Sequence, residues 1–341
     1  MFLQLQEYLW FYYDGASMNN ETLCFNQNAC AIKMLDAGET GAAKSLFYKN
    51  YRENKTPMTL INLACYLADE HNMIDKNLNI FAIRYFRSIR AKRILNRCLK
   101  SFPLEANDYY HLMCLLGSIE VTQGHYDSAI VHYSNARNIK GESIEALSML
   151  AWLLTLRHHY NDADTCLDKL ANALKLGHDM EQNLNTIFEK CPFSRFPYYQ
   201  LVVHVRSYIR PNESNELLHQ MTNTTEDDHE LLFPAEELAL FCLYLKNLKD
   251  FEKIMAYISP DIQKNNDYYN AMLLLMKKIN YKSFIIEHYK KIFKKHISKR
   301  YQYEYAVKRS KWGNDFDYLL STHFYPSYKE CHYVNCPIHS G

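Results

Sequence analysis

The residues with the clearest chemical potential are two cysteines and two histidines near the carboxyl end of the chain. Cys331, Cys336 and His339, with His332 as an alternative, fall within one short stretch. Thiolate and imidazole are the ligands that Zn²⁺ prefers in proteins, so this tail is a candidate zinc site. The spacing C-x4-C-x2-H matches no standard zinc finger. Two other interpretations therefore stay open: a loosely ordered tail whose cysteines are incidental, and a reactive thiol pair.

Familiar catalytic and cofactor-binding sequences are missing. The patterns GxxxxGK, GxGxxG, GxSxG and HExxH do not occur. Nine glycines in 341 residues are well below the usual share of about 7%, which argues against phosphate loops and tight hairpins. We therefore expect a non-enzymatic protein without a required cofactor. Most of the ten cysteines lie in apolar stretches and lack the spacing of a disulfide framework, which favours a cytoplasmic setting.

Positive charge is concentrated between residues 246 and 311. This segment holds 16 Lys and Arg against six Asp and Glu, although the whole chain has a net charge of only +1. Its densest run contains Lys290, Lys291, Lys294, Lys295, Lys299 and Arg300. Such a patch beside tyrosines can hold phosphates and stack bases, so nucleic acid is one candidate partner. The alternative is an ordinary solvated helix face.

The elements that would position these residues are helices arranged in pairs. Two copies of a pair occupy residues 110–177, and three kinds of position recur in them at a spacing of 34 residues: Gly117 and Ala151, Tyr126 and Tyr160, Ala129 and Ala163. Small residues let two helices approach closely, so we expect Gly117 to pack against Ala129. Tyr133 should then fill the groove against the next pair. One hairpin cannot bury its apolar face alone, so neighbouring pairs must stack.

This pattern resembles the tetratricopeptide repeat (TPR) family, a 34-residue helix–turn–helix. Leu116-Gly117 matches its Leu-Gly step, and Ala129-x3-Tyr133 matches its Ala-x3-Phe. The family's Trp, Tyr and Pro are replaced by Met113, Glu120 and Gly141. Weaker copies lie upstream, at Ala43-x3-Phe47 and Ala91-x3-Leu95.

The resemblance implies an all-α fold, a TPR-like right-handed α-solenoid of stacked helical hairpins. We expect an N-terminal capping helix at 1–23, TPR-like repeats at 24–220, degenerate basic helical repeats at 231–311 and a Cys/His-containing tail at 312–341. Prolines predict helices at 198–209 and from about 213 to 221, followed by a linker at 221–230. In the degenerate part, Asn247 overlies Asn280 at a shift of 33.

Members of this family bind peptides in a concave groove lined by the first helix of each repeat. The residues that should face this groove are His111, Cys114, Ser118, Val121, Thr122, Glu145, Ser148, Trp152 and Thr155. Trp152 suits the packing core equally well. We expect an adaptor or scaffold that binds a protein or peptide partner.

Two other functions stay open. One is a nucleic-acid-associated regulator that uses the basic segment. The other is an accessory subunit of a peptide-modifying or export complex with a metal-binding tail. No run of about 20 apolar residues occurs, so we expect no membrane partner. The oligomeric state is not predicted.

Overall fold

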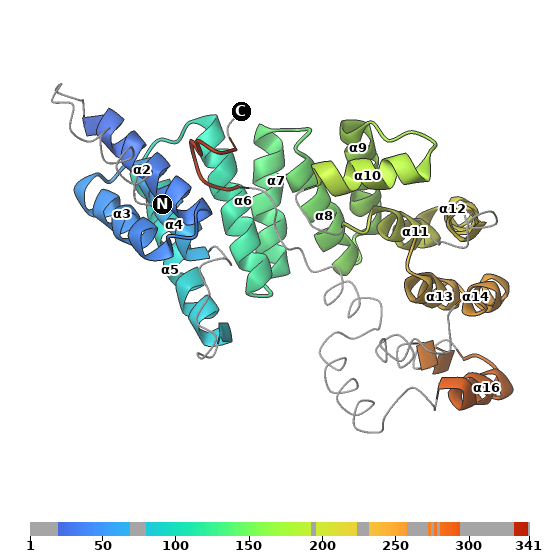
Figure 1. Ribbon diagram of the computed structural model, residues 1–341. Helices are drawn as coiled ribbons and strands as arrows, with labels where there is room; N and C mark the ends of the chain where they lie inside the picture. Colours follow the sequence, from blue (N-terminus) through green and yellow to red (C-terminus); the bar gives the residue numbers. More distant parts are fainter. Residues whose placement is uncertain are drawn as a thin grey trace. The chain divides into compact units, whose positions relative to one another are not determined.

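The regular structure is entirely helical in the residues that the computed structural model describes. These are 20–68, 80–191, 196–223, 232–257, 272–273, 276–277, 280–293 and 331–339. Consecutive helices pair as hairpins, which confirms the predicted all-α fold (Figure 1). The right-handed course of the solenoid stays a prediction. The chain separates into two compact units, residues 1–139 with 331–341 and residues 140–330.

The first unit contains three hairpins, in which α2 pairs with α3, α4 with α5 and α6 with α7. The helices are α2 (Asn20–Asp36), α3 (Thr40–Glu53), α4 (Pro57–Ala68), α5 (Ile80–Ser101), α6 (Ala106–Thr122) and α7 (Tyr126–Ile139). The predicted capping helix lies outside the described residues, apart from 20–23, which belong to α2. Ala43, Ala91 and Ala129 are fully buried, as the repeat pattern requires.

One detail of this packing differs from the prediction. The side chain that meets Gly117 most closely is Tyr133, on the facing helix of the same hairpin, where we expected Ala129. Tyr133 is fully buried. The tyrosine therefore fills the space left by the glycine in its own hairpin, because a bulky ring needs a facing position without a side chain.

The second unit also begins with paired helices. Its members are α8 (Ile144–Leu156), α9 (Tyr160–Leu174), α10 (Met180–Lys190), α11 (Tyr198–Ile209), α12 (Pro211–Asn223), α13 (Ala235–Tyr244), α14 (Leu248–Met255) and α16 (Ser283–Phe293). Helix α8 pairs with α9, α11 with α12 and α13 with α14. Helix α11 has the bounds that the prolines predict. Helix α12 begins earlier than expected, at Pro211, because proline is well tolerated in the first turn of a helix. Most of the predicted linker, residues 224–230, lies outside the described residues.

Five of the inter-helix turns that the structure describes share one backbone motif. Gly38, Gly124, His158, Lys246 and Asn280 each have a positive φ, between 57° and 83°. At Gly124 the N–H donates to the carbonyl of Val121, and the next N–H, of His125, donates to Glu120. This is the Schellman ending of a helix, and the other four turns repeat it. Lys246 and Asn280 occupy the same position in two of these turns and are 34 residues apart. The prediction that Asn280 corresponds to Asn247, at a shift of 33, is therefore wrong by one residue.

Glu120, a buried acidic side chain of the first unit, has two basic side chains as partners. Glu120 is 2% exposed, with Lys92 Nζ 2.5 Å from its Oε1 and His125 Nδ1 2.9 Å from its Oε2. Burial alone would raise the pKa of Glu120, but the hydrogen bonds from Lys92 and His125 outweigh burial and hold this pKa below its usual value. The buried carboxylate of Glu120 thus has a partner at each of its oxygens.

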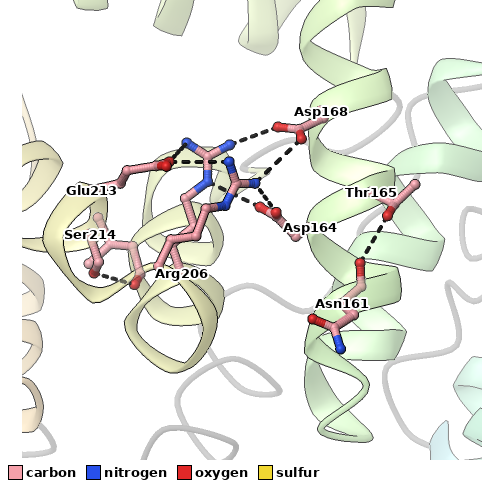
Figure 2. A network of polar contacts seen from close by, with 9 residues as sticks. Asn161, Asp164, Thr165, Asp168, Arg206, Glu213 and Ser214 are labelled. Atoms are coloured by element: carbon pink, nitrogen blue, oxygen red, sulfur yellow. Dashed lines mark hydrogen bonds and ion pairs between the residues drawn. The ribbon is translucent and has the colours of Figure 1, made fainter.

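In the second unit, an ionic network fastens α9 to α11 and α12. Figure 2 shows Arg206 reaching Asp164, Asp168 and Glu213. Its Nε lies 3.0 Å from Asp164 Oδ1, and its Nη2 lies 2.7 Å from Asp168 Oδ1. Arg210 also pairs with Asp164. Two guanidinium groups therefore hold one carboxylate, that of Asp164, at the junction of two hairpins.

Candidate functional site: a docked carboxy-terminal segment

The carboxy-terminal segment 331–339 is not a loose tail, because it lies against the helices of the first unit (Figure 1). Asn62 of α4 holds it by both backbone groups of Val334. The Val334 N–H donates to Asn62 Oδ1 at 2.8 Å, and Asn62 Nδ2 donates to the Val334 carbonyl at 3.2 Å. Asn62 is fully buried and Val334 is 1% exposed. One amide side chain thus satisfies the donor and the acceptor of a single buried peptide residue.

An aromatic contact holds the neighbouring side chain, that of Tyr333. The ring of Tyr333 stacks on Phe47 of α3, with centroids 5.7 Å apart and an interplanar angle of 12°. Phe47 in turn contacts Tyr66 of α4, at 5.3 Å between centroids. Tyr333 is 8% exposed, so almost its whole side chain has left water. Asn62 thus contacts the backbone of the segment, whereas Phe47 contacts one of its aromatic side chains.

The structure brings three of the four predicted metal ligands together. The ligand atoms of Cys331, Cys336 and His339 all lie within 4.8 Å of one another. Cys336 Sγ and His339 Nδ1 are 3.5 Å apart. His332 is buried but is not part of this group. The cluster forms because the chain turns at residues 337–339, where Pro337 fixes a backbone angle suited to a turn.

Most of the predicted groove residues are buried. Six of them are at most 2% exposed: Cys114, Val121, Glu145, Ser148, Trp152 and Thr155. On α8 the reason is that α11 packs against this helix and Cys191 Sγ lies 3.8 Å from Ser148 Oγ. The hydroxyls of Ser148 and Thr155 donate to carbonyls of their own helix. Trp152 is among the largest fully buried side chains, so the core alternative fits it.

Three groove residues, all on α6, retain solvent exposure. His111 and Ser118 are half-buried, and Thr122 is exposed. The two predicted sets lie on helices of different units, α6 in the first and α8 in the second. Peptide binding at these positions stays a prediction.

The basic patch is described only at its start. Lys290 and Lys291 are exposed on α16, and Lys290 Nζ lies 3.2 Å from Glu287 Oε1. Lys294, Lys295, Lys299 and Arg300 lie outside the described residues. Nucleic-acid binding by this segment therefore stays a prediction.

Sequence reasoning missed the residues that hold the tail. Asn62 interrupts the apolar run of α4, Leu60-Ile61-Asn62-Leu63-Ala64, and such a buried amide needs hydrogen-bond partners. That signal could have marked Asn62 as important. Its partner could not have been found, because Val334 is 272 positions away in the sequence.

The comparisons with known proteins leave the family open. No family model and no curated protein matches this chain. Among solved structures, a tetratricopeptide repeat protein from Parabacteroides merdae is similar at 14% identity and a TM-score of 0.43. The match covers 79% of this chain and 98% of that protein. In the part of the chain that the structure describes, no helix has the length and apolar character needed to cross a bilayer.

Proposed function

We propose that this protein is a non-enzymatic scaffold that binds a short peptide segment of a partner protein on helices α3 and α4. The observation that carries the proposal is the hydrogen-bonded pair between Asn62 and both backbone groups of Val334. An amide that pairs with both backbone groups of one residue can hold any segment that presents an N–H and a C=O in the same local conformation. The segment 331–339 then acts as an internal ligand that occupies the peptide site.

Two physical features support peptide binding. The contacting rings of Phe47 and Tyr66 belong to packed helices, so little ordering of the receptor accompanies binding. Hydrogen bonds to the backbone would supply affinity, and the Phe47 ring would supply preference for Tyr or a similar ring at the position of Tyr333. We also propose a cytoplasmic setting, supported by the ten cysteines, none of which is joined in a disulfide in the residues that the structure describes.

The test is a competition between the internal segment and the same sequence supplied in trans. Val334→Pro in the full-length chain removes the N–H that Asn62 accepts and should release the segment. A fluorescent peptide of residues 329–341 should then bind this variant, and it should bind the unmodified chain far more weakly, because that site is filled. Fluorescence anisotropy measures both affinities.

The second variant shows where the peptide binds. Adding Asn62→Ala removes two hydrogen bonds and should weaken binding by about thirtyfold. The matched control is Asn54→Ala, at the end of α3, which should leave the affinity unchanged. Two results would overturn the proposal: an affinity for the peptide that Asn62→Ala does not change, or no binding of the peptide to the Val334→Pro chain.

A further inference from the structure

We infer that Cys331, Cys336 and His339 form a binding site for a Zn²⁺ ion. The ligand atoms of all three lie within 4.8 Å of one another in the segment docked on the first unit. Two thiols and one imidazole are soft donors, which suit Zn²⁺ and not Mg²⁺ or Ca²⁺. This inference does not depend on the proposed peptide-binding function.

The separation of Cys336 and His339 fits tetrahedral coordination. Zn–S bonds of about 2.3 Å and Zn–N bonds of about 2.0–2.1 Å place a sulfur and a nitrogen ligand about 3.6 Å apart in a tetrahedron. Cys336 Sγ and His339 Nδ1 are 3.5 Å apart. A hydrogen bond explains this one distance equally well. It does not explain why the Sγ of Cys331 lies within reach of both atoms.

The conformation of the local backbone brings these three side chains together. Asn335 has a φ of 53°, in the left-handed region that asparagine tolerates, and it reverses the chain ahead of Cys336. The turn at residues 337–339 then brings His339 back toward Cys336. Cys336 is buried, Cys331 is half-buried and His339 is exposed, so an ion can enter from the side of the imidazole.

Binding has a defined proton balance. The thiols of Cys331 and Cys336 each release a proton to solvent on coordination, so the affinity for Zn²⁺ should rise with pH. Three protein ligands leave the fourth tetrahedral position to a water molecule.

The ion would also close the loop that enters the first unit. Tyr333 and Val334, which the first unit buries, lie between the ligands Cys331 and Cys336. A metal ion that joins the two thiolates would hold this loop in its docked conformation. The bound ion is therefore expected to slow exchange of the Val334 amide proton.

The test uses the reduced, full-length chain freed of metal by a chelator. Titration with Co²⁺ should give one ion per chain and the charge-transfer absorption of two thiolate ligands, and Zn²⁺ should displace it. Cys336→Ser should retain the absorption of one thiolate. His339→Gln should weaken Zn²⁺ by at least about tenfold. His339 is exposed, so this variant keeps the core intact.

Two controls define the ligand set. Cys30→Ser, at a half-buried cysteine of α2, and His332→Gln, outside the cluster, should each leave the affinity unchanged. Failure of the reduced chain to bind Zn²⁺ with a defined stoichiometry would overturn the inference. Equal affinity of the His339→Gln and Cys336→Ser variants with the parent would overturn it as well.

Discussion

The ring of Tyr133 occupies the space that a side chain at Gly117 would need. A methyl group at Gly117 would lie 2.5 Å from Cε2 of Tyr133 and 2.8 Å from two further ring atoms. Tyr133 is fully buried in the α6–α7 hairpin, so its ring has nowhere to move. The equivalent positions in the next hairpin hold Ala151 and Leu167. Alanine is larger than glycine and leucine is smaller than tyrosine, so the two changes offset each other.

Gly117→Ala should therefore destabilise the protein, although alanine is the better helix former. Overpacking of this kind costs about 1–3 kcal/mol in the free energy of unfolding, which urea denaturation measures. Adding Tyr133→Leu, which copies the next hairpin, should make Gly117→Ala stabilising. The control is Gly41→Ala in α3, where a methyl group meets no atom within 4 Å; it should not destabilise. Equal effects at both glycines would contradict the argument.

The ionic network predicts unequal roles for two aspartates one turn apart on α9. The side chain of Asp164 is 9% exposed and pairs with both Arg206 and Arg210, whereas Asp168 is 51% exposed. Asp164→Asn removes the most buried of the three carboxylates that both guanidinium groups contact and should lower stability by about 2–4 kcal/mol. Asp168→Asn should lower it by less than about 1 kcal/mol. The comparison is made by urea unfolding, and equal losses would show that burial does not set the strength of the network.

Sequence reasoning succeeded wherever the 34-residue repeat determined the structure. The spacing found the alanines of the hairpins, and the repeated tyrosines Tyr126 and Tyr160 each follow, by two residues, a turn residue of positive φ, Gly124 and His158. It failed in two physically distinct ways. At Gly117 the periodicity gave the facing helix correctly but not which of its side chains fills the gap, since that depends on ring orientation.

The second failure concerns the tail. Local patterns contain no information on a contact such as that of Asn62 with Val334, because the two residues belong to no common repeat. The spacing of Cys331, Cys336 and His339 is local, and for that reason the sequence alone could suggest the cluster.

A buried histidine makes the second unit sensitive to acid. His204 of α11 is 2% exposed and makes edge-on contacts with Tyr160 and Tyr208, whose rings stack on each other. Burial, and secondarily the charge of His158, lower the pKa of His204 to about 3. Between this value and about pH 6.5 the unfolded chain binds a proton that the folded chain does not, so stability falls as pH falls.

The loss should approach about 1.4 kcal/mol per pH unit within that window. His204→Phe keeps a ring beside the two tyrosines and should flatten this slope, as measured by urea unfolding at several pH values. The control is His178→Phe, at an exposed position, which should retain the slope. A slope that survives His204→Phe would mean that another group dominates, for example the carboxyl of Glu120, whose lowered pKa makes its contribution disappear at more acidic pH.

The shared turn motif predicts opposite effects at two exposed lysines. Lys246 has a φ of 58°, where a Cβ is strained, whereas Lys249 lies within α14. Lys246→Gly should stabilise the protein by roughly 0.5–1 kcal/mol, because glycine adopts this angle freely and occupies the same position at Gly124. Lys249→Gly should destabilise it by up to about 1 kcal/mol, since glycine is a poor helix former. Both variants remove one positive charge from nearby surface positions, so a difference in sign between them, seen in thermal unfolding, isolates the backbone as its cause.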